Sequence, residues 1–87
     1  MGKCTDRIEL RHLRYFVSAA EYGSFRKAAA PLGTQESTIS RRVRDLEDRV
    51  GASLFHRYSG GVRVTVAGER YLGHARKVLK HIWDGAN

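Results

Sequence analysis

Apolar residues recur at helical spacing between positions 34 and 50, in TQESTISRRVRDLEDRV. Ile39, Val43, Leu46 and Val50 are separated by four, three and four residues, so they form one stripe along a helix. At about 100° per residue, hydroxyl and guanidinium groups gather on the opposite side. They belong to Ser37, Ser40, Arg41 and Arg44. Such a face suits double-stranded DNA, because arginine can bind guanine O6 and N7 together and serine can contact bases or phosphates. A solvated amphipathic helix has the same pattern.

Two shorter apolar patterns precede this helix. The first predicts a helix from residue 8 or 9 to Gly23, since glycine readily takes the left-handed conformation that ends a helix. Ser24 is the predicted N-cap of a second helix of about two turns, with Pro31 in its last turn. The third helix is expected at 35–50. Two helices joined by a short glycine-containing turn are typical of a helix-turn-helix.

A β-hairpin is predicted after the third helix. Apolar residues at 54–55 and 62–64 flank the turn signal Ser-Gly-Gly at 59–61. The result is a small two-stranded wing beside the helix-turn-helix. Arg57 and Arg63 would place positive charge near a phosphate backbone. An ordinary solvent-exposed hairpin also carries such residues without binding anything.

The last helix is expected from Val66 to about residue 84, with Thr65 as its cap. Its length of roughly 27 Å exceeds what a core of this size needs to cover, so we predict a dimerisation helix. Packing within the chain is the alternative. The apolar residues assigned to the dimer interface are Tyr71, Leu72, Ala75, Val78, Leu79, Ile82 and Trp83.

The composition fits one small domain of 87 residues with an anionic partner. Sixteen Lys and Arg against nine Asp and Glu give a net charge of +7, which favours a polyanion but does not separate DNA, RNA and an anionic membrane. The single cysteine excludes an internal disulfide. No segment approaches the ~20 apolar residues of a membrane span, and none resembles a signal peptide. We therefore expect a soluble, intracellular protein without membrane contact.

The sequence shows no pattern typical of an enzyme. Four histidines lie in different predicted elements, and no cysteine or carboxylate completes a zinc set, so we expect them on the surface or at the dimer interface. No serine lies in a nucleophile elbow, and no glycine loop suits a phosphate. We expect no catalytic residue, metal or cofactor. The histidines are His12, His56, His74 and His81.

Three stretches resemble the N-terminal DNA-binding domain of LysR-type bacterial transcriptional regulators: LRHLRYFVSAAEYGSFRKAAAPLG, STISRRVRDLEDRVGASLFHR and GGVRVTVAGERYL. The resemblance runs from residue 10 to about 82, with the helix-turn-helix, the L-F-x-R segment and the T-x-A-G helix start in the family's order. It implies a mainly α fold, a winged helix-turn-helix of three helices and a two-stranded wing, followed by a long linker helix that pairs in a dimer. The expected organisation is a flexible tail at 1–7, the winged domain at 8–65, the linker helix at 66–84 and a tail at 85–87.

The same resemblance implies which residues read DNA. The family's base-reading positions correspond here to Glu36, Ser37, Ser40 and Arg41. A carboxylate at Glu36 replaces the family's usual amide; it can accept from cytosine N4 but cannot donate to a base, which predicts an altered operator. Gly60 stands where the wing tip often carries a basic residue. The candidate backbone contacts are Ser24, Thr38, Arg42, Arg44, Arg57 and Arg63.

These observations favour sequence-specific binding of double-stranded DNA by a homodimer at an interrupted dyad, for bacterial transcriptional regulation in the cytoplasm, at the nucleoid. The family's effector-binding domain does not appear in these 87 residues, so we expect no small-molecule effector to act within this chain. One alternative is a truncated regulator that heterodimerises with full-length relatives through 66–84. Another is salt-sensitive, sequence-blind binding of nucleic acid.

Overall fold

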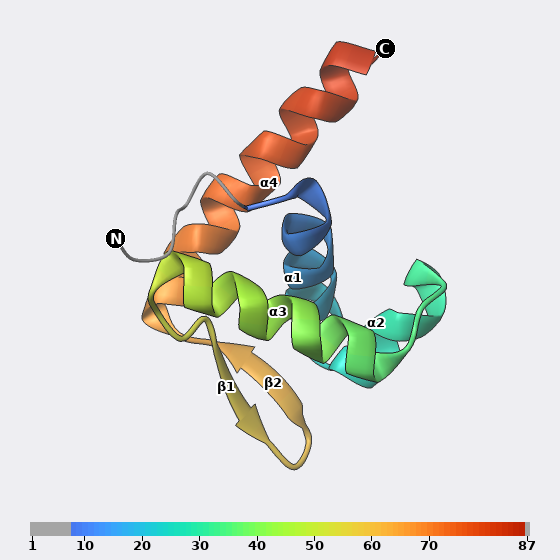
Figure 1. The fold of residues 1–87 in the computed structure, drawn as a ribbon, viewed down its shortest axis with the longest axis vertical. Helices are drawn as coiled ribbons and strands as arrows, with labels where there is room; N and C mark the ends of the chain where they lie inside the picture. Colours follow the sequence, from blue (N-terminus) through green and yellow to red (C-terminus); the bar gives the residue numbers. More distant parts are fainter. Residues whose placement is uncertain (1–7, 87) are drawn as a thin grey trace.

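Four helices and a two-stranded antiparallel sheet make up the fold (Figure 1). The structure is a computed structural model that describes residues 8–86, so the predicted tail at 1–7 and residue 87 lie outside the described residues. The order is α1 (Leu10–Tyr22), α2 (Phe25–Leu32), α3 (Glu36–Val50), β1 (Phe55–Tyr58), β2 (Gly61–Val64) and α4 (Val66–Ala86). The predicted mainly α winged helix-turn-helix with a long final helix is confirmed.

The ends of the short helices follow local sequence chemistry. The Ser24 hydroxyl accepts a hydrogen bond of 3.2 Å from the backbone N–H of Lys27, so the predicted N-cap of α2 is confirmed. Pro31 lies in the last turn of this helix, as predicted. Gly33 then takes a left-handed conformation with φ of 66°. These residues make the tight turn that carries the chain from α2 into α3.

The core lies where α1 meets α2, α3, α4 and the hairpin. The apolar stripe of α3 faces inward as predicted, since Ile39, Val43 and Leu46 are completely buried. In the same core, the centre of the Phe16 ring of α1 lies 5.3 Å from the centre of the Phe55 ring of β1. The polar face of α3 is therefore supported from behind by closely packed apolar side chains.

The hairpin is attached to the turn between α1 and α2. Its strands pair from Phe55 opposite Val64 to Tyr58 opposite Gly61. The backbone N–H of Val62 donates to the carbonyl oxygen of Gly23 over 3.0 Å. A Cβ at Gly61 would lie 2.1 Å from that same oxygen, so only glycine permits this approach. The attachment holds the wing beside the first turn of α2.

The helix α4 differs from its prediction at its end and in its packing. It continues to Ala86, so residues 85 and 86 are helical, whereas a tail was predicted from 85. Leu72 and Ala75 are 9% and 1% exposed and belong to the core. Their assignment to a dimer interface is wrong, because the chain's own core covers them.

The remaining residues assigned to the dimer interface divide into two groups. Tyr71 and Leu79 are half-buried against the core, and the Tyr71 ring lies 5.8 Å from the Phe16 ring. Burial also raises the pKa of the Tyr71 hydroxyl above its usual value. Toward the C-terminus α4 projects away from the rest of the fold (Figure 1). There Val78, Ile82 and Trp83 are 41%, 48% and 71% exposed.

Candidate nucleic-acid interface

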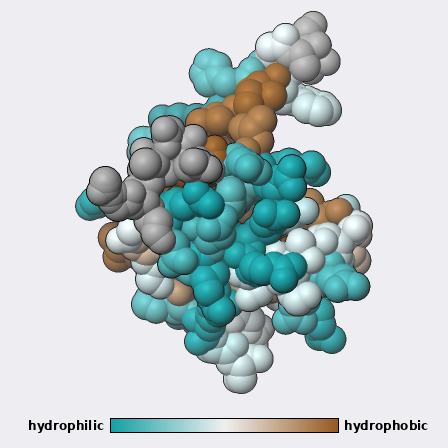
Figure 2. Space-filling view, in the orientation of Figure 1, coloured by the Kyte–Doolittle hydropathy of each residue, from teal (hydrophilic) through white to brown (hydrophobic). Residues whose placement is uncertain are grey.

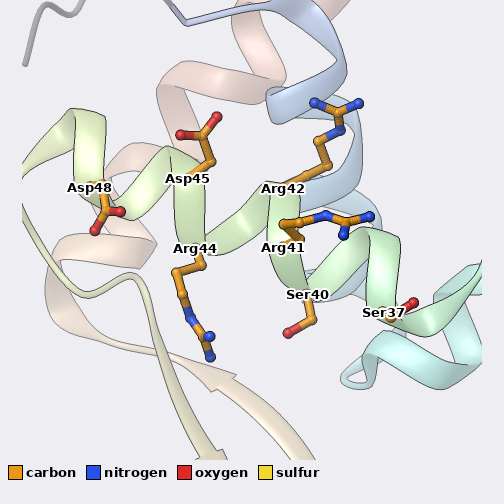
Figure 3. Close-up of a pocket in the computed structure, with 7 residues that line it drawn as sticks. All are labelled: Ser37, Ser40, Arg41, Arg42, Arg44, Asp45 and Asp48. Atoms are coloured by element: carbon orange, nitrogen blue, oxygen red, sulfur yellow. The ribbon is translucent and has the colours of Figure 1, made fainter.

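A shallow concavity covers the outer side of α3 (Figure 3). Helical geometry predicts that Ser37, Ser40, Arg41 and Arg44 gather on this side, and the structure brings all four to the lining. Figure 2 shows the hydrophilic surface over α3 in the middle of this face. The lining also includes Arg42, Asp45 and Asp48.

The arginines of this concavity differ in their pairing from several other cations of the described residues. Arg41, Arg42 and Arg44 have no ion pair within residues 8–86. Five other cations do have a carboxylate partner: Arg11, Arg49, Arg57, Arg76 and Lys80. A polyanion that approached α3 would therefore meet guanidiniums that need not give up an internal partner first.

A second hollow lies between the start of α2, the start of α3 and the wing. Glu36 lines this hollow and not the first, so the structure separates it from the other three residues of the predicted base-reading set. Ser24 lines it as well. Thr38, a predicted backbone contact, lines neither hollow.

Two cations in the second hollow were missed by sequence reasoning. Arg26 and Lys27 are exposed and lie in the first turn of α2. This end of a helix attracts anions, since its backbone N–H groups and macrodipole are positive there. A signal was present in the sequence: two adjacent cations directly follow the predicted N-cap.

Arg57 is held by protein groups, unlike the arginines of α3. It lies opposite Val62 in the hairpin register, and its guanidinium lies 4.8 Å from the centre of the Phe25 ring. One of its terminal nitrogens is 4.0 Å from Glu47 Oε1, and the other donates to Ser40 Oγ over 3.5 Å, which is long for a hydrogen bond. Arg57 thus braces the wing against α3, and its contact with the DNA backbone stays a prediction.

Arg63 lies on the opposite side of the hairpin from Arg57. It pairs with His56 in the register, and its guanidinium lies 5.4 Å from the centre of the Tyr58 ring. All three side chains are exposed. Arg63 has no carboxylate partner within the described residues, so it is more available than Arg57 to bind an anion.

The start of the wing lies between α3 and the start of α4 and has contacts with both. The sequence did not predict the contacts with α3. Glu47 Oε2 accepts from the backbone N–H groups of Leu54 and Phe55 over 2.8 and 3.2 Å. Thr65 caps α4 as predicted, since its hydroxyl oxygen accepts from the Gly68 N–H over 2.9 Å. A Cβ at Gly68 would lie 2.0 Å from the Leu54 carbonyl oxygen. These contacts hold the start of the wing at a set position relative to α3.

His12 links α1 to α3 from inside the fold. It is 2% exposed, so its prediction as a surface or dimer-interface histidine is wrong. Its Nε2 atom lies 2.7 Å from Asp45 Oδ2, and Arg49 Nε donates to Asp45 Oδ1 over 3.1 Å. The hydrogen bond with His12 is the main reason that the pKa of Asp45 lies below its ordinary value, with burial opposing it.

The described part of the chain contains no cluster of three or more His, Cys, Asp or Glu side chains that could hold a metal ion. None of the helices in this part combines the length and apolarity needed to cross a membrane.

Comparison with known proteins gives a family match over most of the chain. The model described as "Bacterial regulatory helix-turn-helix protein, lysR family" matches residues 10–69. The chain is 42% identical over 79 residues to the uncharacterized HTH-type transcriptional regulator YnfL of Escherichia coli K12. That match covers 91% of this chain and 27% of YnfL. The chain therefore spans about a quarter of the length of this relative.

Two similar solved structures contain DNA. The CbnR_DBD–DNA complex has a TM-score of 0.87 and 33% identity, over 91% of each chain. The BenM_DBD/benA site 1 DNA complex has a TM-score of 0.86 and 38% identity, over 91% of this chain and 89% of that one.

Proposed function

The chain belongs to the lysR family of bacterial regulatory helix-turn-helix proteins, and on this premise we propose that it binds double-stranded DNA sequence-specifically, as a homodimer, to regulate transcription in the bacterial cytoplasm at the nucleoid. The observation that carries the proposal is the unpaired set Arg41, Arg42 and Arg44 on the outer side of α3. Two similar structures that contain DNA support it.

The α3 helix enters the major groove in this proposal. Ser37, Ser40 and Arg41 contact base edges, since each can donate a hydrogen bond, lies in the first two turns of the helix and lines the concavity. Glu36 disfavours bases that present only hydrogen-bond acceptors to it, because an ionised carboxylate cannot donate a hydrogen bond. The phosphate backbone is bound by cations and a hydroxyl around the helix. These are Ser24, Arg26, Lys27, Arg42 and Arg44 in the two hollows, and the exposed Arg63 on the wing.

The distal part of α4 joins the two protomers. An apolar groove between α1 and α4 is lined by Leu10, Arg14, Leu79, Lys80, Ile82 and Trp83. Figure 2 shows the corresponding hydrophobic strip along the upper part of α4. A second copy seated on this strip covers apolar surface and places two copies of α3 on one side of DNA. The binding site is then an interrupted dyad. The alternative that 66–84 serves only to pair with longer relatives is not favoured, because it leaves the α3 face without a use.

A charge-matched comparison tests the role of α3. The triple variant Arg41→Ala, Arg42→Ala, Arg44→Ala and a control with Arg11, Arg70 and Arg76 changed to alanine each lose three of the same charges. We expect the α3 variant to lose binding to a fluorescent duplex and the control to keep it. For the control, log affinity should decrease with log salt concentration with a slope of about −0.9 for each phosphate contacted. Equal loss in both variants would mean that net charge alone, and not α3, binds DNA.

A second comparison tests the dimer. Ile82→Asp places a charge on the exposed apolar strip, and His81→Asp places the same charge beside it on the exposed surface. We expect Ile82→Asp to be monomeric in sedimentation and His81→Asp to remain dimeric. A dimeric Ile82→Asp variant would contradict the assignment of this strip to the interface.

A further inference from the structure

His12 is the only buried polar side chain among the described residues, and both of its ring nitrogens are occupied. Nδ1 lies 2.9 Å from the backbone nitrogen of Glu9, which must donate because it carries a hydrogen. Nδ1 therefore accepts and holds no proton. The proton of the neutral ring must then sit on Nε2, which donates to Asp45 Oδ2 over 2.7 Å. The geometry defines one tautomer of His12.

Asp45 stands at the boundary between this buried contact and the concavity on α3. One of its oxygens accepts from His12 and the other from Arg49. The same side chain lines the concavity with Arg41 and Arg42. These arginines precede it by four and three residues, which is the spacing of neighbours on a helix surface. In Figure 3 the carboxylate of Asp45 and the guanidinium of Arg42 point to the same side of α3.

We propose that His12 is a positioning residue for DNA binding: by holding the Asp45 carboxylate toward α1, it prevents this carboxylate from pairing with Arg41 and Arg42. The proposal rests on the function proposed above. Without the imidazole, one carboxylate oxygen loses its partner, and the guanidiniums of Arg41 and Arg42 are unpaired donors one helical turn away in the same lining. A pair formed there would neutralise a cation that the free protein otherwise presents to DNA.

The contact also explains why a histidine suits this position. Its Nδ1 atom satisfies the N–H of Glu9 at the start of α1, while Nε2 reaches α3, 33 residues away in the sequence. A buried apolar ring could fill the space but would leave both the amide and the carboxylate without this partner. One side chain thus ties the beginning of α1 to the middle of the DNA-facing helix.

His12→Phe is the variant that separates packing from positioning, because it keeps a buried ring and removes both hydrogen bonds. Binding to one duplex is measured over a series of salt concentrations. We expect weaker binding by His12→Phe and a salt slope smaller by about 0.9 per protomer, since the phosphate contact of Arg42 is lost. Adding Asp45→Asn should restore both quantities, because the released carboxylate is gone. Thermal denaturation checks that each variant is folded.

The matched control is Asp48→Asn in the His12→Phe background. Asp48 lines the same concavity but has no contact with His12, and Asp48→Asn removes the same charge as Asp45→Asn. Recovery with Asp45→Asn and not with Asp48→Asn supports positioning. Equal recovery, no recovery, or an unchanged slope in His12→Phe overturns it.

A measurement on the free wild-type protein keeps the two proposals apart. Imidazole nitrogen chemical shifts should show His12 neutral, with Nε2 protonated and Nδ1 not. A protonated Nδ1 overturns the positioning inference even if DNA binding is tight. The opposite outcome is the expected tautomer in a wild-type protein that shows no salt-sensitive DNA binding. The function proposed for α3 would then be wrong, and the role of His12 in DNA binding would be withdrawn with it.

Discussion

Replacing Arg41 by alanine tests base recognition most sharply. The side chain is exposed, lines the concavity on α3 and has no ion pair within the described residues, so its removal breaks no ion pair there. Alanine is at least as favourable as arginine in a helix, and stability should be unchanged. A bidentate contact to guanine contributes about 1–3 kcal/mol of discrimination, which corresponds to about 5- to 160-fold in affinity at one base pair. A symmetric dimer loses this contact in both half-sites.

The assay is a competition between the preferred duplex and duplexes changed at single positions, at one salt concentration. For Arg41→Ala we expect the preference to vanish at one position of each half-site and to persist elsewhere. The matched control is Arg70→Ala, which removes an exposed arginine of α4. Equal weakening on every sequence would mean that Arg41 binds a phosphate. An effect no larger than that of Arg70→Ala would place it outside the interface.

Three further predictions concern charge, packing and pH. Glu36→Gln should tighten DNA binding and shift the preferred base, because an amide can donate and is not repelled by phosphate; an unchanged preference in a binding selection would contradict this. Gly68→Ala should destabilise the fold by about 1–3 kcal/mol in urea denaturation, because its Cβ would lie 2.0 Å from a carbonyl oxygen, whereas Gly73→Ala, with open space around it, should stabilise by about 0.5–1 kcal/mol. Asp45 has a pKa below its ordinary 3.8 in the folded protein, mainly because of its hydrogen bond with His12. The ionised carboxylate therefore stabilises the fold above pH 3.8, and this contribution is lost as the pH falls through the folded-state pKa of Asp45. Asp45→Asn should therefore be less stable than wild type at neutral pH, with a difference that shrinks in acid.

Local patterns were sufficient to predict the elements of this fold. The spacing of Ile39, Val43 and Leu46 identified the buried stripe of α3, and the opposite side followed from helical geometry alone. Ser24 and Thr65 were recognisable as caps because capping depends on atoms only three residues away. These predictions needed no knowledge of how the helices pack together.

Contacts between distant residues could not be predicted in the same way. The apolar face of α4 was evident, but the sequence does not say what covers it, and Leu72 and Ala75 proved to be core residues. His12 reads as a surface residue because its partner lies 33 positions away. The contacts of Arg57 could not be predicted because Phe25 and Glu47 come from other elements.

The most direct test of the account is a selection of bound sequences from a random duplex pool at near-physiological salt, with the protein's mass in solution measured in parallel. Enrichment of an interrupted dyad by a dimeric protein is the predicted result. Binding that disappears as salt rises, without enrichment of any sequence, would contradict sequence-specific recognition by α3 and leave only a basic fold.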